Sequence, residues 1–270
     1  MRPSNLVAVM SGAVLLAAAL HAGAQSATVD LDPAARGLAI AREADEKDSG
    51  FKDETANLQM ILRNRNGDQS IRALRIKVIE QDADGDKSLV VFDEPADVKG
   101  TALLTFSHKQ GDDDQWLYLP ALERVKRISS SNQSGPFMGS EFAFEDFTSQ
   151  EVEKFDYNYL REDTLEGRPV HVYERDPLHA KSGYTRQVMW LDNEYFQPLK
   201  IEYYDRKNDL LKVFEGSEYT QYADRYWRAH RMDMENVQTG KSTTILWDNF
   251  AFGTGLRDRD FDRNSLASVR

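Results

Sequence analysis

Short runs of alternating apolar and polar residues, separated by tight turns, dominate this 270-residue chain from residue 58 onward. Twelve such strand-like runs are found, at residues 58–65, 70–80, 87–92, 101–108, 115–119, 152–160, 169–174, 184–191, 199–204, 210–219, 227–237 and 242–250. Turn-forming residues separate them, as at Asn66-Gly67-Asp68 and Thr239-Gly240, and such short separators favour antiparallel hairpins. An antiparallel sheet of about a dozen strands rarely stays flat. The sequence therefore predicts a mainly β protein built on a curled antiparallel sheet.

One helix is expected before the strands. Apolar residues recur at helical spacing between Asp32 and Ser49. Asp32 directly precedes Pro33, which is typical of a helix start, and Gly50 follows the expected last turn.

The N-terminus has the pattern of a secretory signal. Arg2 precedes an apolar run over residues 6–20, and Ala22-Gly23-Ala24 supplies the small residues that a signal peptidase requires. We expect residues 1–24 to be removed and residues 25–270 to form a single domain in the periplasm of a Gram-negative cell. An uncleaved membrane anchor is the alternative. The chain contains no cysteine, so we expect neither a lipid-anchored lipoprotein nor disulfides.

The charge of the chain limits its partners. The formal net charge is −11, which disfavours nucleic acid and anionic membrane surfaces. Against this background Arg124, Lys126 and Arg127 form a basic cluster, which predicts contact with an anionic head group or with a partner protein. The alternative is a solvated strand face, with Val125 and Ile128 directed to the core.

Five segments together resemble one known family. They read FDEPADVKGTALL (92–104), WLYLPALERVKRI (116–128), GPFMGSEF (135–142), FEDF (144–147) and PLKIEYYD (198–205). Their sequences and spacing resemble the outer-membrane lipoprotein-sorting proteins related to the periplasmic carrier LolA, over most of the mature chain. The resemblance implies a half-open barrel with an apolar interior covered by helices, and a hydrophobic cargo such as a lipid or the acyl chains of a lipoprotein. It also implies an inner-membrane transporter of the RND type as a partner.

A carrier must shield its cargo from water, at about 25 cal/mol for each Å² of apolar surface. Phe92, Trp190 and Phe214 are aromatic candidates for the pocket. The residues predicted to line the cavity or its lid are Leu104, Phe106, Trp116, Tyr118, Phe137, Met138, Phe142, Phe144 and Phe147. The last five lie in a loop where Gly135, Gly139 and Ser140 permit motion, so this loop is interpreted as a lid or mouth. The alternative is that these side chains fill the core and the loop packs over the sheet as a short helix.

Catalytic and metal-binding motifs are not found in the sequence. There is no Gly-x-Ser-x-Gly elbow, His-Glu-x-x-His motif or phosphate loop. His171 and His179 flank acidic residues at a spacing that matches no zinc site. The acidic run at 82–86 resembles the start of a calcium loop, but Lys87 stands where that loop needs glycine, so an acidic hairpin turn is expected.

The sequence therefore predicts no enzyme, no cofactor and no metal. The favoured function is a periplasmic carrier that transfers a hydrophobic molecule between membranes. A lipid-sensing regulatory module of the envelope is the first alternative. An envelope hydrolase with an unmarked carboxylate pair is the second.

Overall fold

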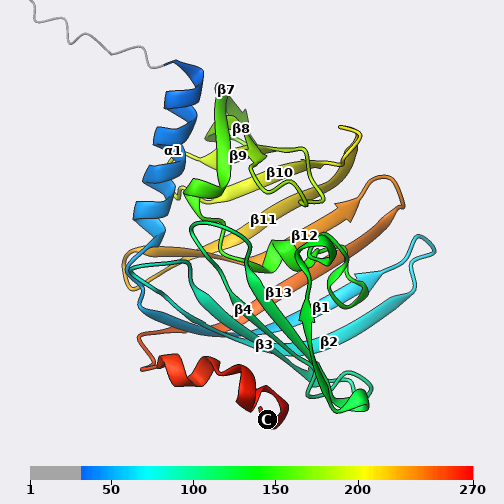
Figure 1. Ribbon diagram of the computed structural model, residues 1–270. Coiled ribbons are helices and arrows are strands. Elements are labelled where there is room, and N and C mark those ends of the chain that lie inside the picture. The colour runs from blue at the N-terminus through cyan, green and yellow to red at the C-terminus, as the bar shows by residue number, and fades with distance from the viewer. Residues whose placement is uncertain (1–31, 270) are drawn as a thin grey trace, which may run out of the picture. The chain divides into compact units, whose positions relative to one another are not determined.

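The chain forms a single antiparallel sheet of 13 strands, preceded by one helix (Figure 1). The computed structural model describes residues 32–269, and the predicted signal at residues 1–24 lies outside them. The helix is α1 (Pro33–Asp48). The strands are β1 (Asp53–Arg63), β2 (Gln69–Ile79), β3 (Lys87–Glu94), β4 (Ala102–Phe106), β5 (Asp114–Leu119), β6 (Arg124–Ile128), β7 (Phe155–Leu165), β8 (Arg168–Pro177), β9 (Arg186–Asp192), β10 (Pro198–Tyr204), β11 (Leu210–Tyr222), β12 (Tyr226–Asn236) and β13 (Lys241–Phe252).

Short 3-10 helices connect or follow these strands. They are η1 (Pro120–Leu122), η2 (Ser130–Asn132), η3 (Phe137–Gly139), η4 (Phe144–Phe147), η5 (Val152–Lys154), η6 (Asp258–Phe261) and η7 (Arg263–Ser268). None of the helices in residues 32–269 is long and apolar enough to cross a membrane.

Two meanders make up the sheet. Strands β1 to β6 pair in sequence order, as do β7 to β13, and the first strand of one meander pairs with the last strand of the other. In that junction Met60 lies opposite Ile245 and Leu58 opposite Trp247. Strands β6 and β7 form the two ends, and they do not pair with each other, so the sheet curls without closing. The predicted fold class, a curled and half-open antiparallel sheet, is confirmed.

Most of the strands predicted from alternation are present, with two differences. Strand β6 was not among the predicted runs because three of its five residues are basic, which hides the alternation. The run expected to begin at residue 152 starts with η5, and β7 begins at Phe155.

The predicted helix is confirmed at both ends. Asp32 caps α1, where its Oδ1 accepts a hydrogen bond of 2.9 Å from the Ala35 amide, and the Ser49 amide closes the last turn on the Asp45 carbonyl. Gly37 lets the helix approach β7 closely, because a Cβ atom at this position would lie 3.0 Å from the Tyr159 backbone nitrogen. Ile40 and Ala41 are buried against the sheet.

Alternation along the strands gives the sheet two apolar faces. On the inner face, Val90, Phe92 and Leu103 join a cluster that includes the buried side of α1 and the segment 129–154. On the outer face, Leu89 and Leu104 pack against η6 and η7. The C-terminal segment lies below β3 and β4 in Figure 1, on the outside of the curl. Both faces of β3 and β4 are therefore buried.

This arrangement corrects the predicted placement of four cargo-binding residues. Leu104, Phe106, Trp116 and Tyr118 all lie in the outer-face cluster. They alternate with Leu103 and Leu117, which face inward. The aromatic and apolar residues on both faces of these strands are equally hydrophobic, so alternation does not tell which face is inner.

The segment 129–154 covers the inner face with short helices. Phe137 is fully buried, and its ring lies 4.4 Å from Phe147, 5.5 Å from Phe144 and 5.7 Å from Phe92, measured between centroids. Phe142 is also buried, and Met138 and Phe147 are partly buried in the same cluster. The structure therefore has the arrangement of the alternative interpretation, in which the loop packs on the sheet and supplies core residues.

The packing of the C-terminal segment can be tested at Leu266, whose side chain is 1% exposed on the outer face. Leu266→Ala should lower the free energy of unfolding by about 2–4 kcal/mol, because it leaves a cavity in a closed cluster. Leu122→Ala is the control, since Leu122 is 67% exposed and its loss should cost about 0.5 kcal/mol or less. Urea unfolding measures both. Equal stabilities for the two variants would mean that η7 does not pack on the sheet.

Candidate functional site

A cavity of ≈ 670 Å³ lies on the inner face of the sheet. Its boundaries are the C-terminal turn of α1, the turn between β2 and β3, the segment around residues 149–152, and strands β7 to β12. Cavities of about 300–1,000 Å³ hold a small-molecule ligand. The size of this cavity and its place on the inner face make it the candidate binding site.

The wall formed by the second meander is apolar. Met189, Ile201 and Phe214 line the cavity from three neighbouring strands, and they face the same side because Met189 pairs with Ile201 and Ile201 pairs with Phe214. The other apolar and aromatic residues that line the cavity are Ala41, Ala44, Phe51, Phe142, Val152, Tyr157, Tyr173, Leu191, Phe196, Pro198, Tyr203 and Met232.

Most of the residues predicted from the sequence to bind cargo lie outside this cavity, although the further candidate Phe214 lines it. Of the nine residues predicted to bind cargo, Phe142 alone lines this cavity. Phe137, Met138, Phe144 and Phe147 pack beside it in the inner-face cluster. The lining residues of β9 to β12 lie in strands that were correctly predicted, but nothing in their alternation distinguishes them from any other strand.

The rim of the cavity is acidic. Asp45, Asp48, Glu80, Asp82, Asp84, Asp86 and Glu151 line it, with Lys109 among them. Burial raises the pKa of Asp86 to about 6. Burial, together with the nearby charge of Asp86, raises the pKa of Glu151 to about 7. These two carboxyls are therefore partly protonated near neutral pH.

The acidic turn at residues 82–86 joins β2 to β3, and its side chains also contact the loop that follows β4. One carboxylate oxygen of Asp84 lies 2.6 Å from Nδ1 of His108, and the other accepts a hydrogen bond of 2.9 Å from the Lys109 amide. These contacts fix the turn between β2 and β3 against the end of β4. Within residues 32–269, no group of three or more His, Asp and Glu side chains is arranged to hold a metal ion.

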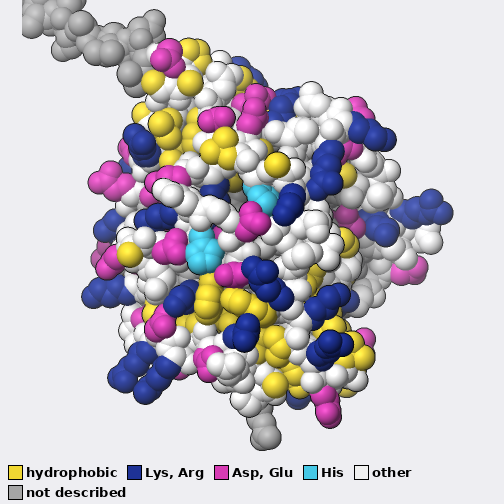
Figure 2. Space-filling model, in the orientation of Figure 1, with side chains coloured by type: hydrophobic (Ala, Val, Ile, Leu, Met, Phe, Trp, Pro, Cys, Tyr) yellow, Lys and Arg dark blue, Asp and Glu magenta, His cyan; other side chains and the backbone are white. Residues whose placement is uncertain are grey.

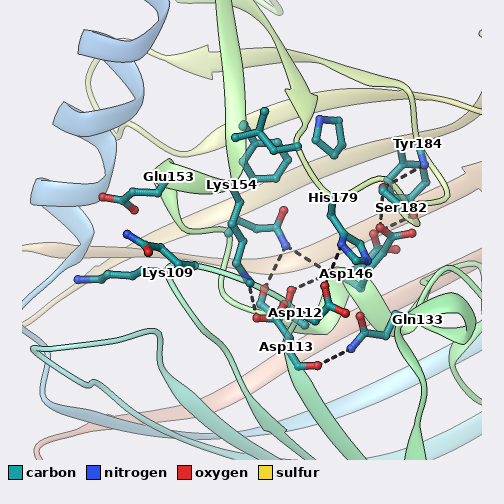
Figure 3. A pocket seen from close by; sticks show the side chains of 18 of the residues that line it. Lys109, Asp112, Asp113, Gln133, Asp146, Glu153, Lys154, His179, Ser182 and Tyr184 are labelled. Carbon is teal, nitrogen blue, oxygen red and sulfur yellow. Dashed lines mark hydrogen bonds and ion pairs between the residues drawn. The ribbon is translucent and has the colours of Figure 1, made fainter.

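A second, smaller pocket of ≈ 360 Å³ adjoins the cavity (Figure 3). Lys154 forms an ion pair with Asp113, and Nδ1 of His179 lies 3.2 Å from a carboxylate oxygen of Asp112. The Tyr184 hydroxyl donates a hydrogen bond of 2.9 Å to Asp146. These pairs join the loops of the protein, and within residues 32–269 the buried Nε2 of His179 has no hydrogen-bond partner.

The predicted basic cluster is divided between the two faces of β6. Lys126 lies opposite Leu117 on the inner side of the strand, whereas Arg127 lies opposite Trp116 on the outer side and forms an ion pair with Asp114. Arg124 shares the side of Lys126, and all three side chains are exposed. Val125 and Ile128 likewise pack on opposite faces, because residues three apart in a strand point in opposite directions. None of the three basic residues lines the cavity.

The face shown in Figure 2 carries acidic and basic side chains interspersed with exposed hydrophobic ones. No extended region of a single charge stands out on this face.

Comparison with known proteins identifies close structural relatives. A family model described as an uncharacterized protein matches residues 84–268. A crystal structure of a domain assigned to outer membrane lipoprotein sorting, from Vibrio parahaemolyticus, is 52% identical with a TM-score of 0.85, and the match covers 87% of this chain and 99% of that chain. A DUF1329 family protein from Desulfovibrio piger is 32% identical with a TM-score of 0.83, over 87% of this chain and 100% of that chain.

Two more distant matches support less about this chain. A LolA superfamily protein from Nitrosomonas europaea is 20% identical with a TM-score of 0.68, over 84% of this chain and 98% of that chain, and it shares the fold. An uncharacterized protein of Methanocaldococcus jannaschii is 39% identical over 56 residues, which are 21% of this chain and 16% of that protein. This chain thus spans a small part of the length of that curated relative.

The buried rim carboxyls make stability depend on pH. Because burial raises the pKa of Glu151 from 4.5 to about 7, the folded chain holds a proton that the unfolded chain has released, and stability falls as the pH rises through this range. Glu151→Gln should therefore be more stable than the parent at pH 8, by about 1 kcal/mol after allowance for partial exposure. The difference should vanish below pH 4.5, where the carboxyl is protonated in both states.

Urea unfolding of both chains at the two pH values measures this difference. Glu235→Gln, which replaces an exposed carboxylate on β12, is the control and should not change stability at either pH. If Glu151→Gln were more stable than the parent by the same amount at both pH values, the raised pKa of Glu151 would not be the cause.

Proposed function

This chain belongs to the LolA-like family of outer-membrane lipoprotein-sorting proteins, and on that premise we propose that it is a periplasmic carrier of a hydrophobic cargo. The proposed role is to bind a lipid, the acyl chains of a lipoprotein or another hydrophobic molecule, and to release it at a second membrane. The role is binding and release, without catalysis.

The observation that carries this proposal is the apolar wall of the cavity on the inner face of the sheet. Its wall of Met189, Ile201, Phe214 and their neighbours offers a dry surface to an acyl chain or a ring system. Transfer of one methylene group from water to such a surface contributes about 0.8 kcal/mol. A chain of about ten buried methylenes would therefore supply most of the free energy of micromolar binding.

The proposed location is the periplasm, which the predicted signal at residues 1–24 supports. We further propose that residues 25–270 act as one LolA-like domain and that an inner-membrane transporter of the RND type delivers or accepts the cargo. The exposed basic residues of β6, at one end of the sheet, are the proposed contact for this partner.

A first experiment tests whether the chain carries a natural cargo. The secreted chain is purified without detergent and analysed by native mass spectrometry, followed by lipid extraction. A stoichiometric adduct that extracts as a lipid or an acylated peptide is expected. A clean unliganded mass, together with no uptake of the uncharged probe N-phenyl-1-naphthylamine, would contradict the proposal.

A second experiment tests the cavity as the binding site. Ala44 lines the cavity from α1 and is partly exposed, so Ala44→Trp should occupy the mouth without removing core packing. We expect about a tenfold loss of affinity for N-phenyl-1-naphthylamine, measured by fluorescence titration. Arg42→Trp is the control, because Arg42 is exposed on the same helix and does not line the cavity. Equal affinities of the two variants would exclude the cavity as the site.

A further inference from the structure

We propose that Arg175, with the hydroxyl groups of Tyr173 and Tyr203, forms an anion-binding subsite on the wall of the cavity, and that the cargo is an amphiphile with one carboxylate head. This inference rests on the proposed carrier function and names the chemical class of its cargo.

Arg175 is a buried cation without an anionic partner. Its side chain lies on β8, lines the cavity, and is 8% exposed. Nε donates a hydrogen bond of 2.8 Å to Oε1 of Gln187, and Nη2 donates one of 3.1 Å to Oε1 of Gln150. The guanidinium carbon also lies 4.3 Å from the centroid of the Phe155 ring. No Asp or Glu within residues 32–269 forms an ion pair with it.

Lys212 is the other buried cation within residues 32–269, and it is paired. Nζ of Lys212, which lines an adjoining surface of the same sheet, lies 2.7 Å from a carboxylate oxygen of Asp146. Arg228 contacts Glu54 at 2.8 Å and Asp48 at 2.6 Å. Removing a charge from water is unfavourable unless an opposite charge compensates it. The unpaired guanidinium of Arg175 therefore indicates that its anionic partner comes with a ligand.

Two tyrosine hydroxyls in the same cavity also lack a partner. Tyr173 is 3% exposed and Tyr203 is 7% exposed, both line the cavity, and neither hydroxyl forms a hydrogen bond with another described residue. Burial raises the pKa of both phenols, against the opposing charge of Arg175, so each retains its proton. Both hydroxyls open into the cavity and are available there as donors to a ligand.

The register of the sheet brings these groups together. Arg175 on β8 lies opposite Gln187 on β9, and Gln187 lies opposite Tyr203 on β10. Tyr173 is two residues before Arg175 and so shares its face. Opposite residues on neighbouring strands are about 5 Å apart at Cβ. The guanidinium and the two phenols therefore converge on one region of the inner face.

A carboxylate suits this group better than other anions. A guanidinium can donate two parallel hydrogen bonds to the two oxygens of a carboxylate, and the phenols can donate further bonds to the same oxygens. One positive charge balances the single charge of a carboxylate, whereas the two charges of a phosphate monoester would leave one uncompensated. Met189, Ile201 and Phe214 then contact the apolar body of the same molecule.

The acidic rim is consistent with this orientation of the cargo. The carboxylates at the mouth would repel an anionic head held there, and they do not pair with Arg175. Asp146 also lines the cavity, but its charge is neutralised by Lys212. The head group is thus favoured at Arg175 and disfavoured at the rim.

The test compares palmitate with methyl palmitate, which has the same chain without the charge. Both are measured by displacement of N-phenyl-1-naphthylamine from the secreted chain at pH 8. We expect palmitate to bind at least about tenfold more tightly than the ester, because a charged hydrogen-bonded pair forms in a site of low dielectric constant. This comparison needs no variant, and equal affinities would overturn the proposal.

Variants then assign the preference to residues. Arg175→Met, which keeps an unbranched side chain without the charge, should reduce the ratio of palmitate affinity to ester affinity by about tenfold, whatever its effect on the probe. Arg186→Met is the matched control, because Arg186 lies on the adjacent strand but faces outward, where it pairs with Glu174 at 2.8 Å. The double variant Tyr173→Phe, Tyr203→Phe should bind palmitate about three- to tenfold more weakly than the parent, with a smaller change for the ester. A preference unchanged in Arg175→Met would overturn the assignment.

The outcomes separate this inference from the proposed function. If the parent chain binds neither the probe nor the two lipids, the carrier function itself fails. If the probe and the ester bind but palmitate is not preferred, the carrier function stands and the carboxylate subsite fails. Tighter binding of hexadecyl phosphate than of palmitate would also overturn the assigned head group.

Discussion

The structure depends on one constraint: a single continuous sheet exposes two apolar faces, and the same chain must cover both. The pairing of β1 with β13 joins the two meanders into this sheet and so creates two faces that run through all 13 strands. On the outer face, η6 and η7 at the C-terminus close over β3 to β6. On the inner face, α1 and the segment 129–154 provide the cover. Segments from opposite ends of the chain are therefore needed to keep water from one sheet.

The cavity results from incomplete cover on the inner face. Phe137, Phe144 and Phe147 fill the space over the first meander, where Phe92 contacts Phe137. Over β8 to β12 the covering segment leaves a space, which Phe142, Asp146 and residues 149–152 line on one side and the apolar wall of Met189, Ile201 and Phe214 lines on the other. An apolar wall without a covering segment costs free energy in the unliganded protein, and a hydrophobic ligand recovers that free energy on binding.

Polar groups near the cavity divide into two kinds. Lys212, Asp146 and Tyr184 satisfy one another and fix the segment 129–154 to β11 and to the chain before β9. Lys154 with Asp113 has a similar structural role. Arg175, Tyr173 and Tyr203 differ because they are buried on the cavity wall with donors that remain free. The first kind stabilises the fold, and the second is the kind that a ligand would complete.

Local patterns in the sequence determined the strands, the turns and the helix capped by Asp32, because periodicity and turn chemistry act over a few residues. Motif resemblance likewise identified the family. Only the tertiary structure decided which face of each strand is the inner one: it placed Leu103 inward and Leu104 outward, and it divided Arg124 and Lys126 from Arg127. It also decided that Arg175, Gln187 and Tyr203 form a row across three strands. The physical reason is that alternation defines two faces but not their direction, which depends on how distant segments pack against the sheet.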